Sequence, residues 1–321
     1  LGAEVDVILG GGLGWWIPQE ANDPGSETYR KLVQKTGGTI EIRSKRSDSR
    51  DLLEEAGVGG LALCFNRTQL EQASGDKILG LFAHDTLMNG IQETRTKKDP
   101  GRSIPTLREM TEKALAILSR NPNGFFLMVE AGLIDWASHD HDTGTLLHEM
   151  IKFDETVAHV YEWATGRQDT LVLVTADHET GGFGFSYSRF DRPAPRTLPG
   201  PAFRGETFHP RRNFGNHLIL DAIYNQKLSY PEILERFDGL PEAAQTPKAL
   251  AEIIEANTEF PVTEAEAASV LGGKTDDTGF YGKGKLFRRN LLARIVSKRQ
   301  LTVWATGNHT NTPVPLIAYG A

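Results

Sequence analysis

Short apolar runs alternate along the chain with longer segments in which apolar residues return at helical spacing. An apolar run bounded by turn-forming residues predicts a buried strand. A periodic segment that opens on a capping pattern predicts a helix, and residues 106–118 are the clearest case, because Thr106 and Glu109 have the spacing of a capping box. The predicted strands cover residues 5–9, 39–43, 61–65, 78–82, 125–129, 171–175, 302–304 and 314–319. The predicted helices cover residues 49–56, 106–118, 145–163, 216–224, 231–237, 247–256 and 287–297.

The order of these elements predicts an α/β fold with a mostly parallel central sheet flanked by helices, because strands and helices alternate. After Gly182 the pattern changes to proline-rich, aromatic and short helical pieces, and the sheet pattern returns only near residue 301. We therefore expect an α/β core formed by residues 1–182 and 301–321. Residues 183–300 are expected to form an insertion.

Composition limits the partners that this chain can have. The formal net charge of its 321 residues is -7, so there is no basic excess to neutralise phosphates, and we expect no nucleic acid as a specific partner. No apolar run approaches the length of a membrane-spanning helix, and we expect no membrane partner. Cys64 is the only cysteine, which rules out a disulfide within the chain. No signal peptide is visible and the chain begins at Leu1, so we expect a processed or truncated polypeptide.

The segment after the predicted strand 125–129 contains the first group of possible metal ligands. Glu130 ends the apolar run, and a turn of small residues leads to Asp135 and His139. Residues four apart lie on the same face of a helical turn, so one carboxylate and one imidazole can point toward the same ion. These groups suit a borderline-soft divalent cation such as zinc.

Two further donor groups stand beside other predicted strands. Asp177 and His178 directly follow the strand 171–175, and His309 precedes the strand 314–319. Ligands of α/β sheets collect at the carboxyl ends of the strands. The sequence therefore predicts a metal site at one edge of the sheet.

Each donor taken alone has a simpler explanation, because a single histidine is more often a solvated or hydrogen-bonded residue than a ligand. We assign no function to His84, His148, His159 or His217, and we interpret His141 and Asp142 as neighbours of the site. The combined cluster is harder to explain as structure, since five aspartate and histidine side chains at strand ends would be costly to desolvate without a metal.

Three motifs occur in the same order in a known family. Residues 130–139 match a glutamate–glycine–isoleucine–aspartate–histidine motif, residues 175–178 a threonine–alanine–aspartate–histidine motif, and residues 307–310 a glycine–x–histidine–threonine motif. Together they resemble the alkaline phosphatase family, and the likeness extends to residues 6–12, 80–83 and 109–114. It is weakest across the insertion, which resembles the crown and large loop of some bacterial members.

The resemblance implies a role for each matched residue. Asp135, His139 and His309 correspond to ligands of a first zinc ion, and Asp177 and His178 to ligands of a second. Glu130 corresponds to a ligand of magnesium. Trp136 is expected to shape the surroundings of the metals without binding one.

The activity implied by the resemblance is hydrolysis of phosphate monoesters through a phosphoserine intermediate, at a site with two zinc ions and one magnesium ion. Two metal ions can clamp the attacking and leaving oxygens of such a displacement. The nucleophilic serine and the phosphate-binding arginine are expected upstream of residue 1, so we identify no catalytic residue in this chain. Ser49 and Ser138 are interpreted as surface or turn residues.

The family also implies expectations for the protein's surroundings. We expect small phosphomonoester substrates, a homodimer, a periplasmic or extracellular location, and an N-terminal segment that complements the chain structurally. Two alternatives remain open. One is a related metal-dependent phosphodiesterase, sulfatase or phosphomutase, and the other is a non-catalytic metal-binding fragment.

Overall fold

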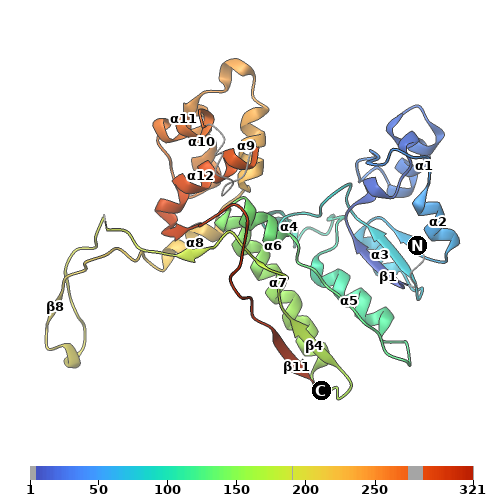
Figure 1. Ribbon diagram of the computed structural model, residues 1–321, viewed down its shortest axis with the longest axis horizontal. Helices are drawn as coiled ribbons and strands as arrows, with labels where there is room; N and C mark the ends of the chain where they lie inside the picture. The colour runs from blue at the N-terminus through green and yellow to red at the C-terminus, as the bar shows by residue number, and fades with distance from the viewer. Residues whose placement is uncertain (1–4, 190, 274–284, 321) are drawn as a thin grey trace. The chain divides into compact units, whose positions relative to one another are not determined.

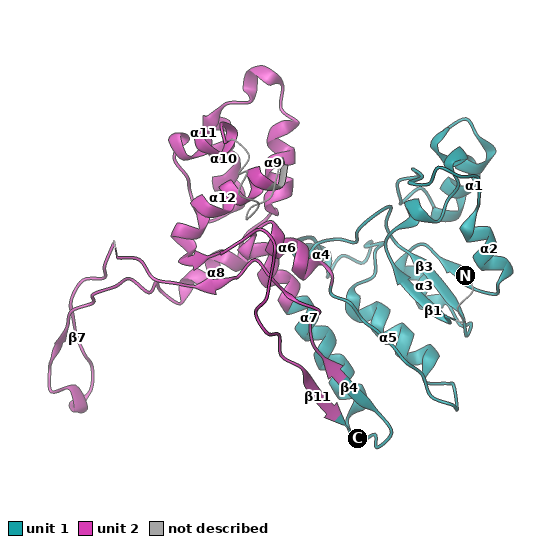
Figure 2. Ribbon diagram, viewed as in Figure 1, with its two compact units in different colours: residues 1–131, 151–172, 320–321 teal, residues 132–150, 173–319 magenta. Residues whose placement is uncertain are grey.

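The computed structural model describes residues 5–189, 191–273 and 285–320, and its helices and strands are shown in Figure 1. The described chain divides into two compact units (Figure 2). Unit 1 comprises residues 1–131, 151–172 and 320–321, and unit 2 comprises residues 132–150 and 173–319. Among the described helices, none combines the length and the apolar character needed to cross a bilayer.

Unit 1 is built on a three-stranded parallel sheet in the order β1-β3-β2. Its strands are β1 (Val7–Gly10), β2 (Ala62–Cys64) and β3 (Ile78–Leu81). The middle strand, β3, is buried along its whole length. Successive side chains of a strand point to opposite faces of the sheet, and the residues of β3 accordingly divide between two apolar clusters, with Leu79 in one and Ile78 in the other.

Helices cover both faces of this sheet. On the face of Leu79, the core includes Leu32 of α1 (Glu27–Thr36) and Leu53 of α2 (Leu52–Val58). On the face of Ile78, it includes Leu70 of α3 (Arg67–Gln72) and Met110 of α5 (Leu107–Leu118). Two short 3₁₀ helices, η1 (Leu13–Trp15) and η2 (Gln19–Asn22), complete this part of the chain. A parallel sheet between two helical layers confirms the predicted α/β class.

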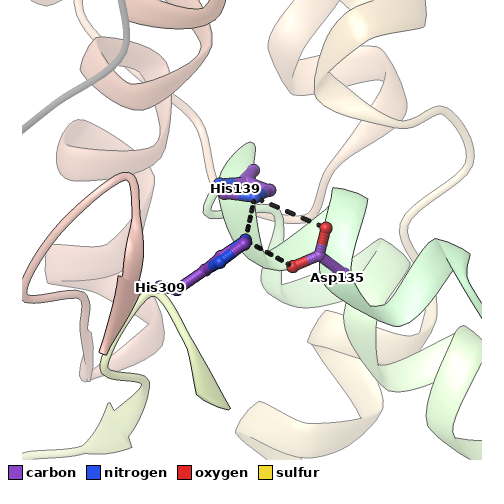
Figure 3. A group of neighbouring side chains, drawn as sticks. All are labelled: Asp135, His139 and His309. Carbon is purple, nitrogen blue, oxygen red and sulfur yellow. Dashed lines mark hydrogen bonds and ion pairs between the residues drawn. The ribbon is translucent and has the colours of Figure 1, made fainter. Parts of the chain in front are cut away.

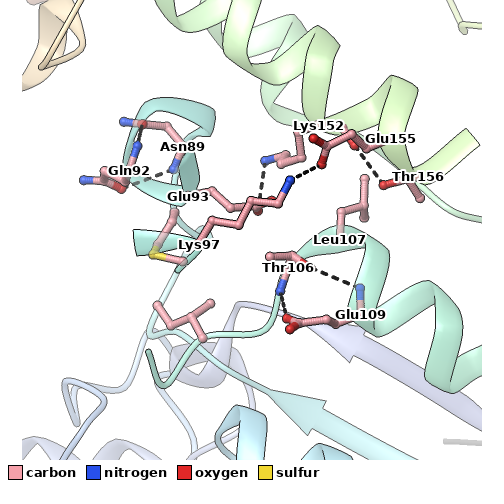
Figure 4. A network of polar contacts seen from close by, with 12 residues as sticks. Asn89, Gln92, Glu93, Lys97, Thr106, Leu107, Glu109, Lys152, Glu155 and Thr156 are labelled. Carbon is pink, nitrogen blue, oxygen red and sulfur yellow. Dashed lines mark hydrogen bonds and ion pairs between the residues drawn. The ribbon is translucent and has the colours of Figure 1, made fainter. Parts of the chain in front are cut away.

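Polar side chains cap two helices of unit 1 and link one of them to a third helix (Figure 4). The predicted capping box of α5 is present, with Thr106 and Glu109 each bonding the other's backbone N–H. Helix α4 (Gly90–Thr96) also begins with a capping box. Lys97, directly after α4, pairs with Glu155 of the long helix α7 (Thr143–Ala164). Helix α7 contributes residues to both units.

Unit 2 contains the short helix α6 (Leu133–His139), a set of paired strands and a group of helices. Four two-stranded sheets pair β5 with β10, β6 with β9, β7 with β8, and β4 with β11. The strands are β4 (Leu171–Val174), β5 (Glu179–Thr180), β6 (Gly184–Phe185), β7 (Arg196–Thr197), β8 (Thr207–Phe208), β9 (Thr302–Val303), β10 (His309–Thr310) and β11 (Ile317–Gly320). β4 and β11 each have residues in both units.

The helices of unit 2 pack around an apolar core of their own. The helices and 3₁₀ turns of this region are η3 (Pro201–Phe203), α8 (Leu218–Tyr224), α9 (Tyr230–Asp238), η4 (Glu242–Ala244), α10 (Pro247–Asn257), α11 (Glu264–Leu271) and α12 (Lys285–Gln300). We call α9, α10, α11 and α12 the helical cluster, and its buried side chains include Tyr230, Phe237, Leu250, Ile254 and Leu292. The predicted division into a core and an insertion at residues 183–300 stays a prediction.

Two predicted strands are wrong. Residues 125–129 form no strand with the described residues, and Phe126 and Met128 are 89% and 68% exposed. Residues 39–43 are also unpaired, although Ile40 and Ile42 are buried on one side as alternation predicts. An apolar run becomes a strand only when a neighbouring backbone supplies hydrogen-bond partners. The last strand begins at Ile317, three residues later than predicted, because the preceding Pro313 and Pro315 have no N–H to donate.

Candidate metal centre

Helix α6 places Asp135 and His139 on one face, as their spacing predicts. Asp135 lies in the first turn of this helix and His139 is its last residue. The Nε2 atom of His139 is 3.4 Å from Oδ2 of Asp135. A single helical turn therefore supplies two donors that could bind the same metal ion.

The third donor arrives from a distant part of the sequence. His309 lies on β10, which pairs antiparallel with β5 so that His309 stands opposite Thr180. Its Nε2 is 3.1 Å from Nε2 of His139 and 3.6 Å from Oδ1 of Asp135. Figure 3 shows the three side chains pointing toward one another from α6 and β10.

These separations suit zinc. The ligand atoms of Asp135, His139 and His309 lie within 4.8 Å of one another. Ligands at zinc bond lengths of about 2.0–2.1 Å in a tetrahedral arrangement are about 3.3–3.4 Å apart. The three separations here, 3.1, 3.4 and 3.6 Å, span that range. Three protein ligands leave a fourth coordination position for a small molecule, which is the arrangement of catalytic rather than structural zinc sites.

Hydrogen bonding orients the first histidine for this task. The Nδ1 atom of His139 is 2.7 Å from the carbonyl oxygen of Gly307. A carbonyl oxygen can only accept, so Nδ1 carries the proton and Nε2 keeps its lone pair. That lone pair lies on the side of Asp135 and His309, where a metal ligand needs it.

Thr180 links this group to the second predicted pair of ligands. Its hydroxyl donates to Oδ1 of Asp135 at 2.6 Å, and Nδ1 of His178 lies 3.2 Å from the same hydroxyl oxygen. Because the hydroxyl proton points to Asp135, the oxygen accepts from Nδ1–H of His178. Nε2 of His178 then keeps its lone pair, and it lies 3.2 Å from Oδ2 of the exposed Asp177. The ring of His178 also stacks on that of His309, with centroids 3.5 Å apart.

The other predicted residues are placed differently. Glu130 is an exposed residue of unit 1, whereas the group described above belongs to unit 2. Trp136 is 58% exposed on α6. Ser138 is buried, and its hydroxyl donates to the carbonyl oxygen of Ile134 within the same helix at 2.8 Å. Ser138 is therefore not presented to the candidate metal ligands. Its interpretation as a surface or turn residue is wrong, because the side chain is buried within a helix.

Sequence reasoning missed the contacts that surround the ligands. Thr180 was not singled out, because its role depends on the register of β5 and β10, which brings it opposite His309. Asp142 was interpreted only as a neighbour of the site, but its buried carboxylate accepts four hydrogen bonds. The spacing of Asp142 and Thr145 was a usable signal, since an aspartate three residues before a threonine suits a helix N-terminus.

Burial also shifts the ionisation of the residues that follow His139. Desolvation raises the pKa of Asp140 to about 6, although the paired Arg289 opposes the shift. Burial lowers the pKa of His141 to about 4, so this imidazole is neutral at physiological pH. Burial likewise raises the pKa of Asp142, against the hydrogen bonds that it accepts.

Known proteins similar in sequence to this chain are alkaline phosphatases. The family described as alkaline phosphatase matches residues 1–261. Alkaline phosphatase 3 of Bacillus subtilis (strain 168) is 29% identical over 275 residues, which are 84% of this chain and 50% of that protein. The tissue-nonspecific alkaline phosphatase of Rattus norvegicus is 33% identical over 183 residues, which are 54% of this chain and 32% of that protein.

Solved structures share the fold. The alkaline phosphatase of Thermus thermophilus aligns with a TM-score of 0.70 at 23% identity, over 99% of this chain and 57% of that one. A cold-active alkaline phosphatase from Shewanella sp. aligns with a TM-score of 0.63 at 24% identity, over 99% of this chain and 60% of that one. The chain spans about half the length of the curated Bacillus relatives that it matches. Since the family match covers most of its residues, the chain belongs to the alkaline phosphatase family.

Proposed function

We propose that this chain supplies the zinc-ligand part of a phosphomonoesterase. Family membership supports a phosphatase in general terms. The observation that carries the more specific proposal is the triangle of Asp135, His139 and His309, whose ligand atoms have the mutual distances of a tetrahedral zinc site. Zinc bound there would act as a Lewis acid toward a phosphoryl oxygen or an alkoxide.

The second zinc is proposed to bind Asp177 and His178, and magnesium is proposed to bind Glu130. Two protein ligands are fewer than zinc sites use, so Asp177 and His178 need at least one donor from outside the described group. The hydroxyl of Thr180 supports a pair of neighbouring zinc sites, because it contacts a proposed ligand of each. Trp136 is proposed to shape the surroundings of the first zinc, since it follows Asp135 on α6.

The nucleophilic serine and the phosphate-binding arginine are proposed to lie on a segment N-terminal to residue 1. Two observations support this. Ser138, the serine nearest in sequence to the proposed ligands, is buried and bonded within its own helix. The chain also corresponds to about half of the relatives that it matches. We propose that the same segment complements the chain structurally, that the longer protein is a homodimer acting on small phosphomonoesters, and that it is periplasmic or extracellular.

Zinc content tests the proposal. The chain is exchanged into metal-free buffer, supplied with limiting zinc and passed through a desalting column, and bound zinc is measured by elemental analysis. We expect about one zinc per chain, lost in Asp135→Ala and in His309→Ala. His217→Ala is the matched control, because His217 is an exposed histidine of the same unit outside the group. A folded chain without zinc, or equal zinc loss in the control, contradicts the proposal.

Hydrolysis of p-nitrophenyl phosphate separates a phosphatase from a non-catalytic metal-binding protein. We expect negligible turnover by the zinc-loaded chain alone and measurable turnover by a longer polypeptide that includes the N-terminal segment. That turnover should fall by at least about 100-fold in Asp135→Ala, since the metal ligand is lost. A zinc-loaded longer polypeptide without turnover would identify a non-catalytic protein.

A further inference from the structure

The turn after α6 is held from outside at every one of its residues. This turn, residues 140–142, connects α6, which carries two proposed zinc ligands and ends at His139, to α7. The side-chain amide of Asn290 donates to the backbone carbonyl oxygen of His139 at 2.8 Å. Arg289 pairs with Asp140 at 3.0 Å. Both partners lie on α12, so the helical cluster contacts the backbone of a proposed ligand directly.

Asp142 ties the same turn to a second helix of the cluster. Its carboxylate is fully buried and accepts from the backbone N–H and hydroxyl of Thr145, at 3.0 and 2.8 Å, as a residue capping α7 does. It also accepts from the amide of Gln226 at 2.7 Å and from the backbone N–H of Tyr230 at 2.6 Å. Tyr230 is the first residue of α9, so one carboxylate receives N–H groups from the starts of two helices.

His141 ties the turn to the segment that carries the third ligand. Its backbone has a φ of 57°, a conformation that residues other than glycine rarely adopt. Its Nε2 donates to the carbonyl oxygen of Thr306 at 2.7 Å, and its ring stacks on Trp304 with centroids 5.0 Å apart. Thr306 directly precedes Gly307, the residue whose carbonyl oxygen orients His139. The turn is therefore fixed against both the helical cluster and the segment that leads into β10, the strand of His309.

We propose that the helical cluster positions the zinc ligands through this turn, with Asn290 and Asp142 as positioning residues. The inference rests on the proposed function, because it takes Asp135, His139 and His309 as metal ligands. His139 is the last residue of a seven-residue helix, so the turn that follows decides where its imidazole stands. Metal sites need their ligands held within about 0.5 Å of the required geometry. A cluster that touches no metal ion thus controls zinc affinity.

The test compares two buried asparagines of the helical cluster. Asn290→Leu removes the amide that bonds the carbonyl of His139. Asn257→Leu is the matched control, because Asn257 is also buried and its amide donates only within α10, to the carbonyl oxygen of Ile253 at 2.7 Å. Zinc affinity is measured by competition with a chromophoric chelator. The absorption spectrum of the cobalt-substituted chain reports ligand geometry, and circular dichroism reports folding.

We expect Asn290→Leu to weaken zinc binding by about 10–100-fold, as for other residues that orient metal ligands. The cobalt spectrum should change with it, whereas Asn257→Leu should retain the affinity and spectrum of the wild type. Equal affinities and spectra for the two variants would overturn the inference and leave the proposed function standing. Absence of zinc from the folded wild-type chain would overturn both. If Asn290→Leu does not fold, Arg289→Gln replaces it in the test. This variant removes the ion pair to Asp140 at a half-buried position, and we expect it to weaken zinc binding to a smaller degree. Unchanged affinity would again overturn the inference.

Discussion

Thr180 is the side chain on which the two proposed zinc sites depend together. Thr180→Val keeps the shape of the residue but removes the donor to Asp135 and the acceptor for His178. We expect zinc affinity to fall by about 10-fold or more, because partners of metal ligands fix both their orientation and their protonation. Thr180→Ser should restore most of the loss. Chelator competition measures both variants, and wild-type affinity in Thr180→Val would contradict this account.

The proposed ligands differ in how far the sequence could predict that their side chains come together. Asp135 and His139 were predictable, because spacing along one helical turn fixes which side chains share a face. For His309 the sequence predicts an approach at a common sheet edge, whereas in the structure the antiparallel pairing of β5 and β10 brings it to the other two residues. Thr180 and Asn290 could not be predicted, since each matters through a contact with a residue more than forty positions away.

Among the secondary-structure elements, α5 provides a direct test of electrostatic stabilisation. Burial alone would raise the pKa of Glu109, but hydrogen bonds from Arg102 and from the backbone of Thr106, with the charge of Arg67, lower it from 4.5 to about 2. A depressed pKa in the folded state stabilises the protein above pH 4.5, and this contribution is lost as the pH falls toward 2. Since Glu109 is partly exposed, we expect its ionisation to contribute about 1–2 kcal/mol to the free energy of unfolding at neutral pH.

Urea denaturation of the chain at pH 7 and pH 3 measures this contribution. The free energy of unfolding of the wild type should fall more between the two pH values than that of Glu109→Gln, which has no charge to lose. Glu112→Gln, an exposed position on the same helix, is the control and should behave as the wild type does. Identical pH dependence in all three proteins would show that Glu109 is not the group responsible.

Helices were easier to predict than strands for a physical reason. A helix satisfies its backbone locally and signals its start in sequence, as the capping box at Thr106 and Glu109 does. A strand needs a partner that the local sequence does not contain. Residues 125–129 have the composition of a buried strand but lie unpaired among the described residues, and residues 39–43 bury alternate side chains without pairing.

At the scale of the whole chain, the paired strands β4 and β11 carry apolar side chains that the described residues leave exposed. Strands that are apolar on both faces are typical of a sheet covered on both sides, and β4 has the sequence Leu-Val-Leu-Val. Yet Leu173 is 56% exposed and Ile317 on β11 is 59% exposed, and the side chains of Leu171 and Leu316 are exposed as well. Exposed apolar side chains on two paired strands favour contact with another protein segment. The α/β class could be predicted from the order of the elements, and the family resemblance predicted a segment that complements the chain. The position of the exposed apolar side chains on β4 and β11 could not be predicted.

We therefore expect the purified chain to associate through β4 and β11. Light scattering after size-exclusion chromatography should show species larger than a dimer, increasing with concentration. The double variant Leu173→Ser, Ile317→Ser should reduce them, because it lowers the apolar area that association buries. Val58→Ser removes a more exposed but separate apolar side chain on α2 and should change little.

If an N-terminal segment covers these strands in the longer protein, its addition as a separate polypeptide should suppress association in the wild type and sharpen its thermal unfolding. A wild-type chain that stays monodisperse at high concentration and unfolds cooperatively by itself would show that β4 and β11 need no cover.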